Sequence, residues 1–234
     1  MRPKLTFGVI GAGTVGAVLG QALAAAGHIL VGFTTTEPAN IERAEVLLPG
    51  AARLTVPEVL QRADFILFAV PGSELGKVIQ GITDLGLWRS GQLVCHTSPA
   101  YGHSVFDPAV DQGVIPIAIH PAMNFTGTSV DLARLRESFF AVSAPPVAVP
   151  IAQALVIEMG GEPFVVAEEN REKYAEAISV ATDFSSLVVN QSIGLLEGVG
   201  LVDSRSILAP LFRSSLERAL AQGHQPIDPE ELLR

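Results

Sequence analysis

Three glycines near the start of the chain have a spacing that suits phosphate binding. Gly11, Gly13 and Gly16 follow the apolar segment 4–10 and precede the alanine-rich segment 17–26. A strand, a tight turn and a helix in that order leave the N–H groups of the first helical turn free to hold a diphosphate. The first glycine makes the turn, the second admits the diphosphate to the backbone, and the third lets helix and strand pack closely. The expected contacts of a bound dinucleotide are Gly11, Ala12, Gly13, Thr14, Val15 and Gly16.

The residues after the next apolar segment, 29–33, bear on which dinucleotide binds. Proteins that prefer NAD usually carry an acidic residue at this strand end, where it binds the ribose 2′-hydroxyl. Here the segment is followed by three hydroxyl side chains, Thr34, Thr35 and Thr36. Glu37 comes one position late, and Arg43 is the next arginine that could meet a 2′-phosphate. The pattern favours NADP as the cofactor and leaves NAD open.

Three later apolar segments, 64–70, 92–96 and 114–119, end in residues that could contact the rest of a ligand. In an open parallel sheet, ligands bind beyond the carboxyl ends of the strands. The strand-end residues expected to contact the cofactor are Val70, Pro71, His96, Thr97 and Ser98.

His120 directly follows the segment 114–119 and is the first candidate for a catalytic residue. Hydride transfer to a carbonyl or an imine requires a proton donor near the developing charge. A histidine suits that role because its unperturbed pKa is near neutrality. The alternative is a histidine that only satisfies backbone groups of the loop beside Pro121.

The chain changes character after a charged cluster at 168–173. The segment 174–197 contains no proline and repeats its apolar residues at helical spacing. Short polar side chains, Asp183 and Asn190 among them, fall on the other side of that helix at 100° per residue. Both are tentative catalytic candidates if this stripe lines a cleft. An exposed face and a polar contact between subunits are the alternatives.

The remaining pattern alternates strands with helices, which predicts an α/β fold with a doubly wound, mainly parallel Rossmann sheet and a small all-α domain behind it. We expect the dinucleotide-binding domain at 1–168 and the helical domain, for substrate binding or dimerisation, at 169–234. Further strands are predicted at 139–142 and 163–167, and helices at 55–62 and 206–222. The segment 228–231 resembles another helix start.

The composition narrows the functional classes. With 48% hydrophobic and 17% charged residues, the 234-residue chain should bury a substantial core. A net charge of −9 argues against a nucleic-acid partner, because phosphate backbones require a basic surface. One cysteine forms no internal disulfide, and the histidines lack the short spacings of a metal site, so we expect no metal.

The charge-free segment 5–27 could be mistaken for a signal peptide or a membrane span. Its glycines stand at turn spacing, which a strand, a turn and a helix require and an export signal does not. We therefore expect a soluble, cytoplasmic protein with no membrane partner.

The chain resembles the uncharacterised Rossmann-like dehydrogenases of the 6-phosphogluconate dehydrogenase-like superfamily, whose N-terminal domain is similar to that of pyrroline-5-carboxylate reductases. The resemblance implies an NAD(P)-binding domain, a helical C-terminal domain and a homodimer built on the latter. The segments that carry it are 8–16, 69–71, 96–98 and 119–121, together with Tyr174 and 181–183.

Three positions depart from this family. Pro99 stands where relatives usually have glycine, Ala175 where they have histidine, and Asp183 where they have asparagine. We expect an NAD(P)-dependent oxidoreductase that transfers a hydride between a nicotinamide and a small metabolite, either a keto/hydroxy or an imine/amine pair. The alternative is a non-catalytic NAD(P)-binding sensor or regulatory protein, which these departures favour.

Overall fold

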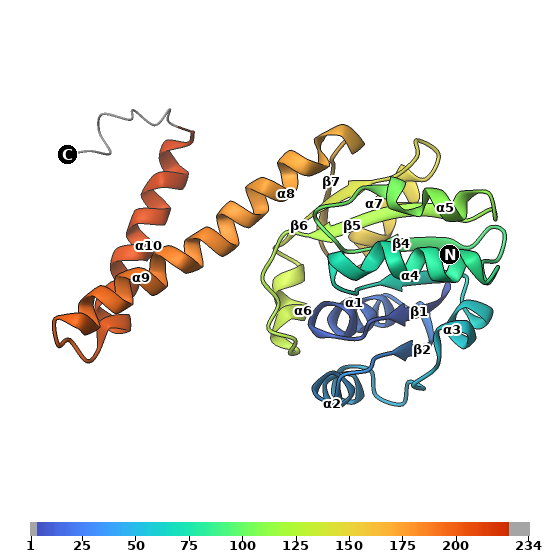
Figure 1. Ribbon diagram of the computed structural model, residues 1–234, viewed down its shortest axis with the longest axis horizontal. Helices are drawn as coiled ribbons and strands as arrows, with labels where there is room; N and C mark the ends of the chain where they lie inside the picture. The colour runs from blue at the N-terminus through green and yellow to red at the C-terminus, as the bar shows by residue number, and fades with distance from the viewer. Residues whose placement is uncertain (1–3, 225–234) are drawn as a thin grey trace. The chain divides into compact units, whose positions relative to one another are not determined.

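The computed structural model describes residues 4–224, and the chain forms two compact units, residues 1–178 and 179–234. The first unit contains a seven-stranded sheet with helices on both faces, and the described part of the second consists of helices (Figure 1). The predicted α/β class with a helical C-terminal region is confirmed. The two units divide between residues 178 and 179, close to the end of a helix. The expected domain boundary after residue 168 stays a prediction. The helix start expected at 228–231 lies outside the described residues.

The sheet has the strand order β2-β1-β3-β4-β5-β6-β7. All neighbours pair in parallel except β5 and β6, which are antiparallel. The strands are β1 (Thr6–Ile10), β2 (Ile29–Thr34), β3 (Phe65–Phe68), β4 (Leu93–His96), β5 (Ile115–Pro121), β6 (Phe139–Ser143) and β7 (Glu162–Val165). The helices of this unit are α1 (Thr14–Ala25), α2 (Pro38–Leu47), α3 (Val56–Arg62), α4 (Gly72–Asp84), α5 (Asp107–Val110), α6 (Val130–Leu135), α7 (Val149–Glu158) and α8 (Arg171–Ser179), with 3₁₀ turns at His103–Phe106 and Glu168–Asn170.

Both faces of the sheet are buried at its centre, which explains why β3 is apolar at every position. In β3, Phe65 and Leu67 join the core formed with α1 and α7, whereas Ile66 and Phe68 join the core formed with α3 and α4. Each such side chain contributes about 1.5–3 kcal/mol to folding. The two cores hold the sheet rigid, so the positions of its strand ends are well determined.

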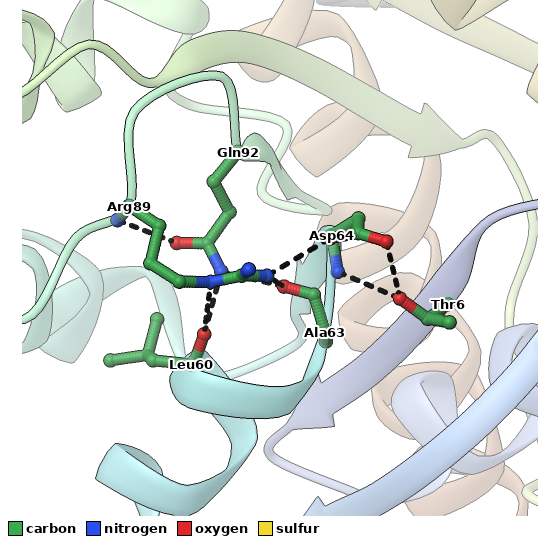
Figure 2. A network of polar contacts seen from close by, with 6 residues as sticks. All are labelled: Thr6, Leu60, Ala63, Asp64, Arg89 and Gln92. Atoms are coloured by element: carbon green, nitrogen blue, oxygen red, sulfur yellow. Dashed lines mark hydrogen bonds and ion pairs between the residues drawn. The ribbon is translucent and has the colours of Figure 1, made fainter.

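A polar network fastens α3 to the amino-terminal edge of the sheet, at the opposite ends of the strands from the site described below (Figure 2). The buried Gln92 amide donates to the carbonyl oxygens of Leu60 and Ala63, at 2.9 and 2.7 Å. Arg89 donates to the same two carbonyls and to the Asp64 carboxylate. These side chains satisfy backbone acceptors that the end of α3 leaves unpaired.

The second unit continues α8 through a π-helical turn, Val180–Phe184, into α9 (Ser185–Gly198), and ends with α10 (Ser204–Gln222). The expected long helix over 174–197 is therefore present, with a widened turn that the sequence pattern does not reveal. Because a π turn adds a residue per turn, a stripe drawn at 100° per residue does not stay in register across it. No helix within residues 4–224 is long and apolar enough to cross a membrane.

The network in Figure 2 predicts a specific loss of stability. Replacing Gln92 with leucine removes two donors and leaves buried carbonyl oxygens short of partners, which should lower the free energy of unfolding by about 1–3 kcal/mol. Urea unfolding, followed by the fluorescence of the chain's one tryptophan, Trp88, measures the change. The control is Gln80→Leu, an exposed glutamine of α4. Equal losses in the two variants would contradict the structural role of the network.

Candidate functional site

A cavity of about 640 Å³ lies at the carboxyl ends of the parallel strands. Five segments of the chain line it: 11–15, 34–40, 69–72, 97–99 and 120–125. The sequence-predicted residues among its lining are Gly11, Gly13, Thr14, Val15, Thr34, Thr35, Thr36, Val70, Pro71, Thr97, Ser98 and His120. Ala12, Gly16 and His96 were also expected to contact the cofactor, but all three are buried beneath the surface of the cavity.

The turn between β1 and α1 requires glycine for steric reasons. Gly11 has a φ of +93°, and a Cβ there would lie 2.8 Å from the carbonyl oxygen of Ala69. A Cβ on Gly16 would collide with the carbonyl oxygen of Gly11. The N–H groups of Gly11 and Ala12 donate to the carbonyl oxygen of Thr34, which ties the turn to the end of β2.

The amino end of α1 can accept an anion. No side chain of the N-cap residue, Gly13, caps this end, and the first turn has no acidic side chain; the Gly13 N–H itself donates to the carbonyl oxygen of Gly11 at 2.8 Å. The N–H groups of Thr14 and Val15 have no acceptor inside the helix, and both residues line the cavity. The closest atom to a Cβ on Gly13 would be the Asn40 side-chain nitrogen, at 3.6 Å, so the backbone is open here. The residues present therefore fit the diphosphate of a dinucleotide.

Two charged residues, Glu37 and Arg43, lie at the part of the cavity where the three threonines are. Glu37 and Asn40 line it together with the three threonines. The Arg43 guanidinium donates to the Asn40 side-chain oxygen, and a Cβ on Gly127 would lie 2.5 Å from Arg43 Nε. Arg43 therefore does not line the cavity itself but contacts Asn40, which does.

The loop that carries Gly127 is held by a fully buried carboxylate. Asp131 accepts hydrogen bonds from the N–H groups of Thr126 and Gly127, each at 2.8 Å, and from the Thr126 hydroxyl. In the structure it fixes the preceding loop, which places Phe125 in the wall of the cavity.

His120 lies near the carboxyl end of β5 and is half-buried. Its Nδ1 atom is 2.7 Å from the Tyr174 hydroxyl, and the two rings meet edge to face. Burial lowers the pKa of His120 to about 4, with further contributions from the charges of Arg171 and His96. The ring is therefore neutral at pH 7, which corrects the expectation of a pKa near neutrality.

His96 orders the loop that follows β4 and has no free ring nitrogen. Its Nδ1 accepts the N–H of Ser98 at 3.2 Å, so Nε2 carries the hydrogen and donates to the carbonyl oxygen of Gly102 at 2.8 Å. Burial lowers its pKa to about 4. Instead of contacting a ligand directly, His96 shapes the turn that presents Ser98 and Pro99 to the cavity.

The same loop is anchored at its other end by Glu168. This carboxylate accepts the N–H groups of His103 and Ser104 and the hydroxyls of Ser104 and Ser143. Partial burial alone would raise the pKa of Glu168, but the hydrogen bonds from Ser104 and Ser143 outweigh it, and the pKa lies below its usual value. Two anchors thus hold the segment between His96 and Ser104.

Tyr174 and Arg171 belong to the site's surroundings, and residue reasoning alone did not identify them. Arg171 is 2% exposed, and its guanidinium carbon lies 5.7 Å from the centre of the Tyr174 ring. In the sequence Arg171 is one member of a charged cluster that would ordinarily be solvated. No local signal reveals the burial of Arg171. The neighbouring Tyr174 is brought to His120 by a contact that spans 54 positions of the chain.

Asp183 and Asn190 are exposed residues of the second unit, and Asp183 accepts a hydrogen bond from Ser179 at 2.8 Å. Their catalytic role stays a prediction.

Several solved structures similar to this chain are described as oxidoreductases or reductases. A Bacteroides fragilis protein described as an NADP oxidoreductase is 19% identical, with a TM-score of 0.73 over 92% of this chain and 80% of that one. An imine reductase from a Pseudomonas species is 16% identical, with a TM-score of 0.68 over 94% and 76%. A 1-pyrroline-5-carboxylate reductase from Streptococcus pyogenes is 13% identical, with a TM-score of 0.67 over 98% and 84%. At these identities the likeness establishes the fold.

No curated protein matches the chain in sequence. Two family models do match it. Residues 1–121 match the Rossmann-like domain, and residues 138–227 match the domain of unknown function DUF2520. The chain therefore belongs to the Rossmann-like domain family and carries a DUF2520 segment behind that domain.

Proposed function

We propose that the protein is an NAD(P)-dependent oxidoreductase that transfers a hydride between a nicotinamide cofactor and the carbonyl or imine of a small metabolite. One observation carries the proposal: a single cavity joins the open amino end of α1 to His120. The similar solved structures support it, since their descriptions are those of oxidoreductases with the same fold.

The lining residues divide the work of holding the cofactor. The N–H groups of Thr14 and Val15 would bind the diphosphate beside the open backbone of Gly13, and the segment 34–40 would bind the adenosine ribose. The nicotinamide would lie toward Val70 and the segment 97–99, and when bound it supplies the hydride that the reaction transfers.

His120 is the proposed proton donor. Within the described residues its hydrogen bond is the one from Nδ1 to Tyr174, which leaves Nε2 available to a substrate. If the Tyr174 hydroxyl donates to Nδ1, the hydrogen of the neutral ring lies on Nε2. That N–H can donate to the substrate oxygen or nitrogen as negative charge develops there.

Removing this ring should abolish turnover and spare cofactor binding. We expect His120→Ala to lower kcat by roughly 10²–10⁴-fold, the usual contribution of a general acid, with the dissociation constant of NADP(H) unchanged. Cofactor oxidation is measured with panels of keto acids, aldehydes and cyclic imines. His224→Ala, at an exposed histidine of the second unit, is the control. Tight NADP(H) binding without turnover of any panel member would instead favour a cofactor-binding sensor.

We further propose that NADP is the preferred cofactor. Three hydroxyls, the Asn40 amide and the nearby Arg43 can together bind a 2′-phosphate. Glu37 opposes this preference, because its carboxylate would repel the phosphate and could accept the hydroxyls of NAD.

Two substitutions test the preference in opposite directions. Arg43→Ala should weaken NADP⁺ binding by about tenfold or more, the value of one charge-assisted hydrogen bond, and leave NAD⁺ binding nearly unchanged. Glu37→Gln should strengthen NADP⁺ binding relative to NAD⁺. Calorimetric titration of both cofactors against both variants measures the ratio. Equal effects on the two cofactors would show that neither side chain meets the 2′ position.

The second unit is proposed as the dimer contact. Large apolar side chains are more than half exposed along its helices: Phe184 (59%), Leu187 (62%), Leu195 (67%), Leu211 (61%) and Leu220 (82%). Single exposed apolar residues are ordinary, but this many on one short unit suits association with a second copy.

Sedimentation velocity tests this contact. The protein should sediment as a dimer, and the double variant Leu187→Glu with Leu211→Glu should sediment as a monomer, because burying two carboxylates opposes association. The matched control is the pair Val46→Glu and Leu85→Glu, at exposed apolar positions of the first unit. A monomer at micromolar concentration before mutation would refute the proposal.

A further inference from the structure

Arg171 is a buried cation whose hydrogen-bonding capacity is mostly unused. Among residues 4–224 its Nε and Nη1 atoms have no hydrogen-bond partner, and Nη2 donates to the carbonyl oxygen of Ala141 at 3.4 Å. Glu168, a carboxylate whose charge acts on Arg171, is already engaged by two backbone N–H groups and two hydroxyls and lies 2.9 Å from His103 Nδ1. Leaving a buried charge without compensation costs several kcal/mol, so its retention here calls for an explanation.

Arg171 lies close to the candidate proton donor, His120. Ala141 pairs with His120 across β5 and β6, so the guanidinium lies beside the end of the cavity that His120 lines. Tyr174 lies between the two residues, with its hydroxyl on His120 Nδ1 and its ring face toward Arg171. Phe164 also packs against that ring, edge to face, at 6.0 Å between centroids. The resulting row runs from the cavity to His120, then to Tyr174, then to Arg171.

A neutral histidine cannot complete a proton donation alone. If Nε2 gives up the one ring hydrogen, an imidazolate remains unless Nδ1 gains a proton at the same time. The Tyr174 hydroxyl is the group placed to supply that proton. The tyrosinate formed would then face the Arg171 cation, whose hydrogen-bonding capacity is mostly unused.

We propose that Tyr174 and Arg171 complete a proton relay that works through His120; this inference rests on the proposed function. A carbonyl that has gained a hydride has an alkoxide oxygen, which takes the proton of His120 Nε2. His120 Nδ1 takes the proton of the Tyr174 hydroxyl, so the imidazole stays neutral and its hydrogen moves to Nδ1. The charge now on the Tyr174 oxygen is stabilised by Arg171. A water then protonates Nε2 while Nδ1 returns its proton to the Tyr174 oxygen, which restores the hydroxyl and the starting tautomer and releases hydroxide. The oxidation of an alcohol reverses each step.

The relay itself contains His120 of β5 and Arg171 of α8. His96 of β4 and Glu168 of the turn before α8 are further titratable groups whose charges act on these two residues. Burial raises the pKa of Tyr174, and the charge of Arg171 counteracts part of that rise. The pairing of Tyr174 with Arg171 therefore predicts an effect on the titration of Tyr174 that can be measured without a substrate.

The first experiment titrates that tyrosine. The chain has two tyrosines, so the variant Tyr101→Phe leaves Tyr174 as the one whose ionisation changes the absorbance near 295 nm. In this background Arg171→Met should shift the titration of Tyr174 to higher pH, whereas Arg171→Lys should shift it less. Arg136→Met, at an exposed arginine, is the control and should cause no shift. An identical titration in the parent and in Arg171→Met would overturn the proposed pairing.

The second experiment removes the Tyr174 hydroxyl and also holds if Arg171→Met does not fold. In Tyr174→Phe, ¹⁵N NMR should show that His120 loses its preference for a hydrogen on Nε2. With an active substrate, kcat should fall by about 10²-fold or more while KM stays within twofold. An unchanged tautomer or an unchanged kcat would refute the relay. The tautomer and the tyrosine titration require no turnover, so they separate failure of the relay from failure of the proposed function.

Discussion

The contact between the β1–α1 turn and the backbone at the end of β3 is the constraint on which the site depends. Gly11 is pressed against the carbonyl of Ala69, and the helix starts so close to the strand that Gly16 nearly touches the carbonyl of Gly11. Only backbone fits in that space. Because no side chain covers the amino end of α1, its N–H groups face the cavity, and the helix dipole adds to their attraction for an anion.

The chemistry at the other end of the cavity depends on long-range packing. His120 reaches the cavity because β5 extends to Pro121, and the antiparallel β6 and the start of α8 then bring Arg171 and Tyr174 behind it. Anchoring side chains support the loops around this end: Asp131 holds the segment before α6, and His96 with Glu168 holds the segment after β4. A neutral histidine, a tyrosine and a buried arginine thus lie together beside the cavity.

The features predicted well from the sequence are those determined within a few residues. The β1–α1 turn and the Thr55–Glu58 capping box are local, because their partners lie three to five positions apart, and both are present. Strand ends were also placed well, since runs of apolar residues buried on two faces stop where the sheet stops. Local pattern does not determine which way a strand-end side chain points. His96 was therefore expected in the cavity, but it turns inward to hold its own loop.

Features that depend on contacts between residues far apart in the chain could not be predicted from the sequence. The lowered pKa of His120 results from burial and from Arg171, which is brought to it by two strands and a turn. Arg171 reads as a surface charge, and its burial follows only from the fold.

The most direct test of the central claim is to locate a bound dinucleotide on the backbone. Amide NMR shifts recorded during titration with NADP⁺ should change most at Gly13, Thr14 and Val15, with smaller changes at the segments 34–40 and 97–99. Inorganic diphosphate alone should move the first three and leave the segment 97–99 in place. If saturating NADP⁺ leaves Gly13, Thr14 and Val15 unmoved, the amino end of α1 is not a diphosphate site, and the account of this protein as a nicotinamide-dependent oxidoreductase is wrong.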